Sequence, residues 1–137
     1  MEDTSKHFVG KVAQKAIIEK NGKVLVCRGV GDKVWELPGG RVHENEEPTE
    51  GLIREIKEEL NIEVKIARPL HVCRSLHVKT NKWRIFIGYI CTVISDFEEK
   101  LDKTEIEEVK WVSKEELKNL PMFDDCRELA DVYLKVV

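Results

Sequence analysis

Apolar residues along the chain recur with two spacings, one typical of strands and one typical of helices. Residues 8–19 and 23–28 are rich in Val, Ile and Ala and flank Asn21-Gly22, a dipeptide that tolerates the positive φ angles of a tight turn. This pattern predicts a β-hairpin at the start of the chain. Further extended segments are predicted at 34–37, 62–70, 71–78, 84–94 and 108–112. We expect the first of these to end where Pro38-Gly39-Gly40 begins.

Helical spacing dominates the segments between and after these strands. Residues 49–60 carry an apolar stripe that predicts one helix, formed by Leu52, Ile53, Ile56 and Leu60. Ser113 and Glu116 have the spacing of a capping box, which predicts the start of a second helix. A third is predicted from the apolar residues Cys126, Leu129, Ala130 and Tyr133. The alternation of strands and helices predicts an α/β fold with a central mixed sheet.

A second side of the helix at 49–60 is acidic. Glu55, Glu58 and Glu59 are three and four residues apart, so they are neighbours on the helix surface. Each like-charged pair of this kind costs a helix about 0.2–0.5 kcal/mol. A solvated acidic face is the common explanation. However, the glycines before the helix allow a backbone carbonyl to approach, and Mg²⁺ prefers oxygen ligands. A bound divalent cation would therefore also account for the cluster.

Composition and charge exclude several classes of protein. The 137 residues, 42% of them hydrophobic, suit one domain spanning residues 1–137. With 23 basic and 26 acidic side chains, the net charge of −3 argues against generic nucleic-acid binding. The four cysteines form no CxxC pair, so we expect reduced, structural thiols. No apolar run is long enough to span a membrane and no signal-peptide core is present, which predicts a cytoplasmic protein without membrane attachment.

The spacing from Gly40 to Ile62 matches a family motif. Gly40, then Glu46 six positions later, then the run REIKEELNI from Arg54 to Ile62 resembles the Nudix box, G-x5-E-x7-R-E-U-x-E-E-x-G-U with U apolar. The WELPGG lead-in to Gly40 and the later VKWV segment are also similar to this family. One position departs, because the final glycine of the box is Asn61 here. Asn is the usual second choice for the left-handed residue that ends a helix, so we expect the change to be tolerated.

This resemblance implies a Nudix-type α/β/α sandwich that hydrolyses a diphosphate linkage in a nucleoside diphosphate derivative with Mg²⁺ or Mn²⁺. The metal ligands implied are Glu55, Glu58 and Glu59, together with the carbonyl of Gly40. Any of the three glutamates is also a candidate general base. Glu46 and Arg54 resemble the family's structural ion pair. A further catalytic carboxylate often comes from a later loop, for which Glu105 is our candidate, with Glu107 and Glu108 as rivals.

Substrate recognition is less well specified by the sequence. Arg41 and Arg28 are candidates for phosphate binding, because a planar guanidinium suits phosphate oxygens, and Trp35 is a candidate for stacking on a base. Ordinary surface ion pairs and core packing are the alternatives for these residues. Trp83 is a weaker stacking candidate, and His43, His71 and His77 lack metal-ligand spacing. The sequence does not name the substrate.

Three classes of function remain open at this stage. The favoured one is a pyrophosphohydrolase acting on a small nucleotide substrate such as a nucleoside triphosphate, an oxidised nucleotide or ADP-ribose, as a monomer or homodimer. The second is a regulatory module on the same fold that binds nucleotides without turnover. Such modules usually lose a carboxylate of the box, and none is lost here. The third, an interaction domain with an acidic helix, would leave the spacing of the box as coincidence.

Overall fold

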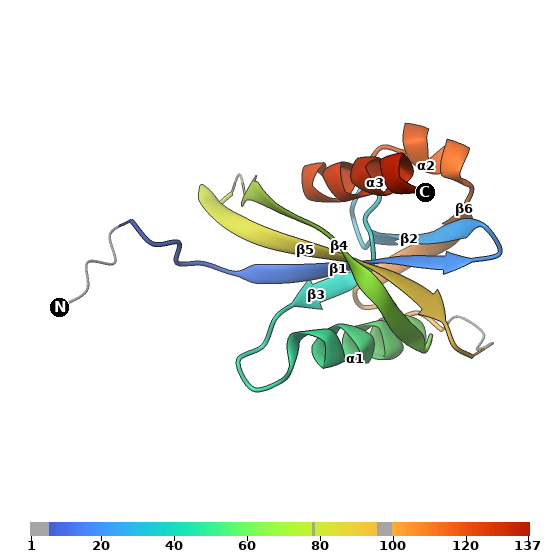
Figure 1. The fold of residues 1–137 in the computed structure, drawn as a ribbon, viewed down its shortest axis with the longest axis horizontal. Coiled ribbons are helices and arrows are strands. Elements are labelled where there is room, and N and C mark those ends of the chain that lie inside the picture. Colours follow the sequence, from blue (N-terminus) through green and yellow to red (C-terminus); the bar gives the residue numbers. More distant parts are fainter. Residues whose placement is uncertain (1–5, 78, 96–99) are drawn as a thin grey trace.

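The computed structural model describes residues 6–77, 79–95 and 100–137 and arranges them around a mixed sheet with helices on both faces (Figure 1). The strands within these ranges are β1 Val12–Lys20, β2 Lys23–Gly29, β3 Gly39–Arg41, β4 Val64–His77, β5 Lys82–Val93 and β6 Ile106–Val112. The helices are α1 Pro48–Leu60, α2 Lys114–Asn119 and α3 Asp124–Val136. None of them is long and apolar enough to cross a lipid bilayer.

The sheet has the strand order β4-β5-β1-β2-β6, with β3 paired to β1. β1 and β5 are parallel, whereas the other pairs are antiparallel. Helix α1 lies on one face, and α2 and α3 lie on the other (Figure 1). The predicted α/β class with a mixed sheet is confirmed.

The first hairpin is present, but its strands separate soon after the turn. Asn21 and Gly22 have φ angles of 53° and 75°, as a tight hairpin turn requires. β1 and β2 pair at Glu19↔Val24 and Lys20↔Lys23. Farther from the turn, the segment before α1 occupies the gap between them. On the β2 side Glu36 bridges Cys27, and on the β1 side β3 pairs with residues 13–15.

This insertion corrects two predictions from the sequence. Within residues 34–37, Trp35 and Glu36 form isolated bridges rather than a strand. Gly39 and Gly40, predicted to end a strand, are instead the first two residues of β3. The physical reason is the narrow space beside β1, where a Cβ on Gly39 would overlap the carbonyl oxygen of Gln14. Here the absence of a side chain permits strand pairing, whereas glycine in a strand usually weakens it.

The predicted segments 62–70 and 71–78 merge into one strand, β4, which begins two residues later than predicted, at Val64. Its register shifts at Ile66/Arg68 and at Pro69/His71. Val78 lies outside the described residues. The other local predictions hold. Ser113 and Glu116 form the capping box of α2. Asn61 ends α1 with φ 58° and ψ 36°, the left-handed conformation expected for the position where the box has glycine.

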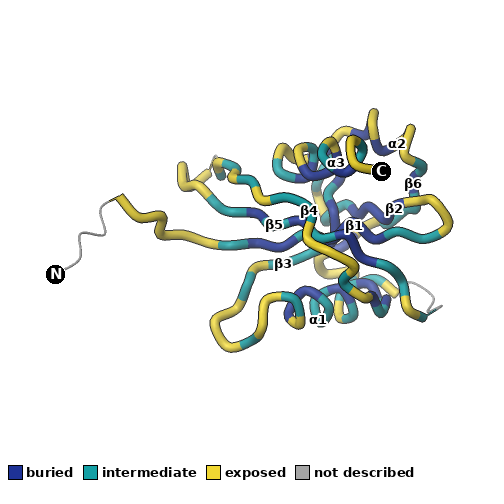
Figure 2. Tube along the Cα trace, viewed as in Figure 1, coloured by how far each residue is buried: buried dark blue, intermediate teal, exposed yellow. Residues whose placement is uncertain are grey.

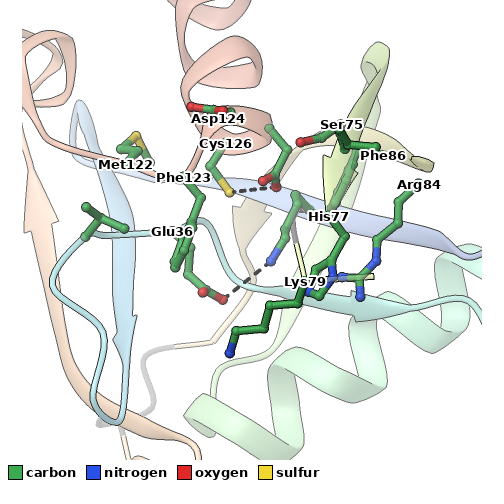
Figure 3. Close-up of a pocket in the computed structure, with 14 residues that line it drawn as sticks. Glu36, Ser75, His77, Lys79, Arg84, Phe86, Met122, Phe123, Asp124 and Cys126 are labelled. Atoms are coloured by element: carbon green, nitrogen blue, oxygen red, sulfur yellow. Dashed lines mark hydrogen bonds and ion pairs between the residues drawn. The ribbon is translucent and has the colours of Figure 1, made fainter. Parts of the chain in front are cut away.

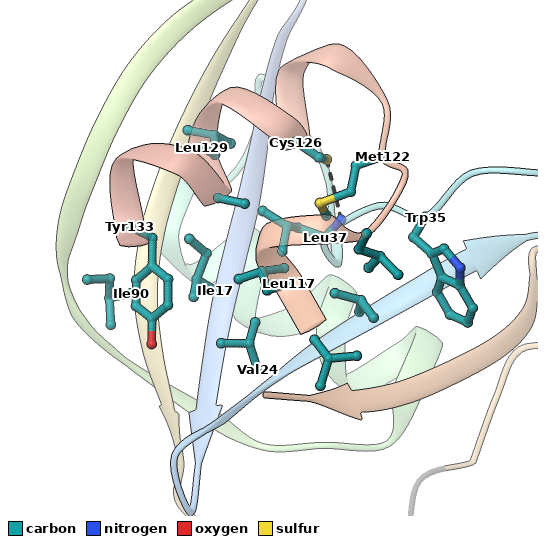
Figure 4. Close-up of a cluster of buried hydrophobic side chains, with 14 residues drawn as sticks. Ile17, Val24, Trp35, Leu37, Ile90, Leu117, Met122, Cys126, Leu129 and Tyr133 are labelled. Carbon is teal, nitrogen blue, oxygen red and sulfur yellow. Dashed lines mark hydrogen bonds between the residues drawn. The ribbon is translucent and has the colours of Figure 1, made fainter. Parts of the chain in front are cut away.

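Two hydrophobic clusters fix the helices to opposite faces of the sheet (Figure 2). Leu52, Ile56 and Leu60 of α1 pack with residues such as Ile18, and the predicted Ile53 is partly buried against the same cluster. On the other face, α2 and α3 contribute Leu117, Cys126, Leu129 and Tyr133 to a second buried cluster (Figure 4). The four cysteines are free thiols. The acidic side of α1 therefore keeps a fixed position relative to β3.

The tight contact of Gly39 yields a prediction about stability. Gly39→Ala should lower the free energy of unfolding by about 3 kcal/mol, because the added methyl group meets backbone that cannot move independently. Gly29→Ala is the matched control, since a Cβ there would lie 2.6 Å from the side-chain oxygen of Asp32, which can rotate away. Urea denaturation would measure both. Equal losses in the two variants would contradict the close approach of β3 to β1.

Candidate functional site

The candidate site forms where the acidic side of α1 meets β3. A Cβ on Gly40 would lie only 3.0 Å from the side-chain Cδ of Glu55, so the glycine lets the carboxylate rest against the strand. Glu105, in the loop immediately before β6, lines the same hollow as Gly40 and Glu55. This hollow, which we call the Gly40 cavity, has a volume of about 490 Å³. Residues from three separate segments thus meet at one place.

Glu59 joins this group from the next turn of α1. Burial raises its pKa to about 8, and the charges of Glu55 and Glu105, together with hydrogen bonds to both, act in the same direction. Near neutral pH Glu59 therefore retains a proton in the metal-free protein, which reduces the repulsion among the three carboxylates. Glu59 and Glu105 also line a second hollow, the Glu59 cavity, of about 370 Å³.

Glu58 is placed differently from the other box carboxylates. Its side chain is 61% exposed, and it accepts a hydrogen bond from Arg54 Nη1 at 3.0 Å. Among the described residues, no group of three or more His, Cys, Asp or Glu side chains is arranged to hold a metal ion as it stands. Gly40, Glu55, Glu59 and Glu105 nonetheless suit a hard divalent cation, because oxygen donors gather there, and burial together with the charges of Glu55 and Glu105 raises the pKa of Glu59.

Arg54 and Glu46 form a bidentate pair between α1 and the loop before it. The Nη2–Oε1 and Nε–Oε2 distances are 2.6 Å and 3.0 Å. The hydrogen bonds from Arg54 hold the pKa of Glu46 below its ordinary value. Gly51, which sequence reasoning did not single out, makes this contact possible, since a Cβ there would lie 2.8 Å from Glu46 Oε1.

His43, which lacks metal-ligand spacing in the sequence, also lies beside these carboxylates. Its ring nitrogens are 3.7 Å from Glu46 Oε1 and 3.9 Å from Glu55 Oε1. No regular spacing connects it with the glutamates, so only the folded loop brings them together. The other two set-aside histidines lie elsewhere: His71 contacts Glu128 of α3, and His77 lines a cavity on the α3 side of the sheet.

The predicted substrate-binding residues do not all gather at this site. Arg41 is exposed and lines the Gly40 cavity. The guanidinium of Arg28 instead donates to Glu107 at 2.6 Å and to Glu108 at 3.1 Å. Glu107 and Glu108, the alternatives to Glu105 as the later catalytic carboxylate, are therefore both paired with Arg28. Trp35 is only 9% exposed and belongs to the core cluster on the α3 side.

A larger cavity of about 550 Å³, the α3 cavity, opens on the other side of Glu36 (Figure 3). Asp124 and Cys126 enter it from α3, and Arg84 and Phe86 enter it from β5. Lys15 of β1 lines it as well. Local sequence patterns do not indicate this cavity, because its walls come from β1, the segment before β3, β4, β5 and the start of α3. Glu36 lines both the α3 cavity and the Glu59 cavity, so the two hollows adjoin.

Comparison with known proteins supports the family suggested by the spacing from Gly40 to Ile62. The family model described as the NUDIX domain matches residues 12–131. The CTP pyrophosphohydrolase of Escherichia coli K12 is 31% identical over 111 residues, covering 78% of each protein. The nucleoside triphosphatase NudI of Enterobacter sp. strain 638 is 30% identical over 125 residues, covering 81% of this chain and 87% of that protein. By contrast, Nudix hydrolase 5 of Arabidopsis thaliana is 32% identical over 111 residues, and the match spans 77% of this chain but only 36% of the plant protein.

Solved structures agree with these sequence matches. A NUDIX-family hydrolase from Clostridium perfringens superposes with a TM-score of 0.75 at 27% identity, covering 91% of this chain and 96% of that one. The MutT NUDIX hydrolase from Burkholderia pseudomallei has the same fold, with a TM-score of 0.78 at 24% identity and coverage of 88% and 95%. The family suggested by the spacing from Gly40 to Ile62 is confirmed, and this chain belongs to the Nudix hydrolases.

Proposed function

We propose that this protein hydrolyses the diphosphate linkage of a nucleoside diphosphate derivative, with a divalent cation as cofactor. The observation that carries the proposal is the meeting of Glu55, Glu59 and Glu105 beside Gly40, next to a cavity of nucleoside size. Phosphoryl chemistry needs charge neutralisation and an aligned water more than covalent participation by the protein. A cluster of carboxylates beside the Gly40 cavity would supply the ligands for that task.

The residues that would hold Mg²⁺ or Mn²⁺ are Glu55, Glu59 and Glu105, with the carbonyl of Gly40. Bound there, the cation would neutralise phosphate charge and lower the pKa of a water ligand. Glu58 would join the set only by leaving Arg54, whose Nη1 it now contacts at 3.0 Å. This assignment keeps Glu55 and Glu59 from the sequence prediction and gives Glu58 a secondary place.

The remaining polar residues would position the substrate. Arg41, exposed beside Gly40, is our candidate for binding a phosphate oxygen. For Arg28 and Trp35 we favour structural roles, since the first has two carboxylate partners and the second is buried. The nucleoside would occupy the α3 cavity, so that its phosphates pass Glu36 to reach the carboxylates. Apolar and aromatic walls with a few polar groups are typical of such ligand cavities.

The names of the relatives support a nucleotide substrate. One matched bacterial protein is a CTP pyrophosphohydrolase, and another is a nucleoside triphosphatase. Nucleoside triphosphates are therefore the first compounds to test. A screen for product release over triphosphates, oxidised nucleotides, ADP-ribose and nucleotide sugars, with and without Mg²⁺, would test the function directly. No metal-dependent hydrolysis of any of them would refute the proposal.

Isosteric substitutions at the carboxylates would test their assignment. Glu55→Gln, Glu59→Gln and Glu105→Gln should each lower kcat by about 10²- to 10⁴-fold, because each removes a charge that would hold the cation. Glu50→Gln, at an exposed position in the first turn of the same helix, is the matched control and should retain wild-type rates. Steady-state kinetics at saturating Mg²⁺ would measure this. Wild-type rates in the three site variants would reject the metal site.

The raised pKa of Glu59 predicts how the metal-free protein responds to pH. Folding favours its protonated form, since its pKa rises from the ordinary value of 4.5 to about 8. The stability that this gives is fully present below about pH 4.5 and is lost as the pH rises through about 8. The melting temperature measured with a chelator should therefore fall between about pH 4.5 and 8. Glu59→Gln should flatten the fall, whereas Glu50→Gln should not. An unchanged profile in Glu59→Gln would exclude Glu59 as its origin.

The ion pair of Arg54 and Glu46 should matter for both stability and rate. Arg54→Ala should lower the melting temperature, because Glu46 loses its partner, and should lower kcat by up to about 100-fold through displacement of Glu55 and Glu59. Arg54→Lys keeps the charge but loses the bidentate geometry, so it should fall between wild type and Arg54→Ala. Thermal melts and kinetics on the same samples would measure this. Normal stability with lost activity would indicate a chemical role for Arg54 instead.

A further inference from the structure

The charges of the chain are unevenly distributed, and one hairpin carries only positive ones. Residues 64–95, which form β4 and β5, contain no Asp or Glu, so all 26 acidic side chains lie outside this segment. The segment contains six lysines and arginines, Lys65, Arg68, Arg74, Lys79, Lys82 and Arg84. All of them except the half-buried Arg84 are exposed. The net charge of −3 argues against nucleic-acid binding over the whole surface, but it does not describe this hairpin.

The turn end of this hairpin extends beyond α1 and α3 and carries an uncovered aromatic ring (Figure 1). Trp83 is 42% exposed, and the guanidinium carbon of Arg74 lies 4.0 Å from the centre of its ring. Leu76 pairs with Trp83 and Arg74 pairs with Ile85, so these side chains share one face of the sheet. Val72, two residues before Arg74, is 60% exposed on the same face. An indole ring and a guanidinium thus lie together at the surface, with apolar side chains beside them.

The cations at this end of the hairpin lack carboxylate partners. Within residues 6–77, 79–95 and 100–137, no ion pair involves the four nearest the turn, Arg74, Lys79, Lys82 and Arg84. By contrast, Arg28 and Arg54 each contact two or more carboxylates. Positive charge at the hairpin is therefore left uncompensated by the part of the protein that the structure describes.

The pKa of His77 reflects this local excess of positive charge. Desolvation lowers it, and so do the charges of Arg84, Lys79 and Lys11. Lys11 lies beside β5 because its carbonyl accepts a hydrogen bond from the backbone N–H of Ile85 at 3.1 Å. Cations from β5, from the turn and from the segment before β1 therefore meet around the end of the hairpin.

A single-stranded nucleic acid complements both the charge and the ring. Its phosphates are anionic, and its unpaired bases stack on aromatic side chains and on arginine guanidinium groups. In a duplex the bases are stacked on one another, so Trp83 would gain no such contact. A second copy of this chain is disfavoured, because a two-fold interface at this surface would bring the same unpaired cations together. The combination of cations with an exposed tryptophan therefore favours a single strand.

We propose that the turn end of the β4–β5 hairpin binds single-stranded nucleic acid. A base stacks against Trp83 and Arg74, and the backbone phosphates contact Lys79, Lys82 and Arg84. We call these five residues the basic hairpin surface. The proposal goes beyond the proposed function, because this binding needs neither a divalent cation nor the carboxylates of α1. Lys79 and Arg84 also line the α3 cavity, so the basic hairpin surface borders that cavity.

Metal-free binding of short oligonucleotides tests this proposal independently of hydrolysis. Fluorescence anisotropy would follow 3′-labelled oligo(U) and oligo(dT) of about 12 nucleotides, within the usual size of such sites. Both would carry a 5′-hydroxyl end, and a chelator would be present. Wild-type protein should bind both, with a slope of log K against log salt of about −2, as expected for three phosphate contacts on a single strand. No binding of either, or equal or tighter binding of a duplex of the same length, would overturn the proposal.

Two variants separate stacking from charge. Trp83→Ala should weaken binding of both oligonucleotides by about 5- to 100-fold, the range for losing one stacked base, and should leave the salt slope unchanged. The double variant Lys79→Gln/Lys82→Gln should reduce the size of the slope by about 1.4, because it removes two phosphate contacts. The matched control, Lys114→Gln/Lys118→Gln, makes the same change of charge at exposed positions of α2 and should keep wild-type affinity and slope.

The alternative explanations give different results. Unchanged affinity in Trp83→Ala, an unchanged slope in Lys79→Gln/Lys82→Gln, or equal losses in the α2 control would each overturn the proposal. Inorganic polyphosphate, which has no bases, should bind equally to wild type and Trp83→Ala, whereas a loss as large as that for oligo(U) would contradict stacking. Self-association, or binding to vesicles containing phosphatidylserine, without oligonucleotide binding would assign the surface to a second copy or to a membrane and would also overturn the proposal.

Discussion

The close approach of Gly39 and Gly40 to their neighbours is the constraint on which the site depends. Gly39 lies so near the carbonyl of Gln14 that no side chain fits, and Gly40 leaves only enough room for the carboxyl group of Glu55. Together they let β3 enter the opened hairpin while α1 packs beside it. The apolar residues of α1 then hold the helix on the sheet, so its acidic side is directed at β3.

Electrostatics explains how the metal-free fold tolerates so many acids at this place. Arg54 contacts Glu46, Glu55 and Glu58, with distances of 2.6, 3.3 and 3.0 Å. Glu59 has no contact with Arg54 among those described. Its raised pKa means that it retains a proton near neutral pH, so it needs no cationic partner. The box therefore contains two ways of balancing charge, an arginine at one end and a shared proton at the other. A bound cation would compensate the negative charge near Glu59, which Arg54 does not reach.

Local sequence patterns predicted the elements that depend on local physics. The Asn21-Gly22 turn, the capping box of α2 and the left-handed Asn61 each follow from the conformational preferences of one or two residues. The strand order does not, because nothing in the spacing of 8–19 and 23–28 indicates that the hairpin opens to admit another segment. For the same reason the sequence misjudged Pro38-Gly39-Gly40. A glycine that breaks an isolated strand is required in a strand whose neighbour comes too close for a Cβ.

The site shows the same division between local and long-range information. The family motif named Glu55, Glu58 and Glu59 together, since a helix makes them neighbours. It could not show that Glu58 contacts Arg54, or that Glu105 from a distant loop hydrogen-bonds with Glu59. His43 and Gly51 were missed because their contacts depend on how the loop before α1 folds back. The α3 cavity was missed because four elements distant in sequence form it.

Glu36 lies between the α3 cavity and the carboxylates of the candidate site. It lines the Glu59 cavity on one side and the α3 cavity on the other, and its backbone is fixed by two hydrogen bonds with Cys27, of 2.9 and 2.8 Å. Its position therefore depends on the sheet rather than on a mobile loop. Lys15 and Gly39, which face each other across the β1–β3 pairing, fix the same region from the β1 side. Strand pairing therefore fixes the position of Glu36 relative to both the α3 cavity and the carboxylates of α1.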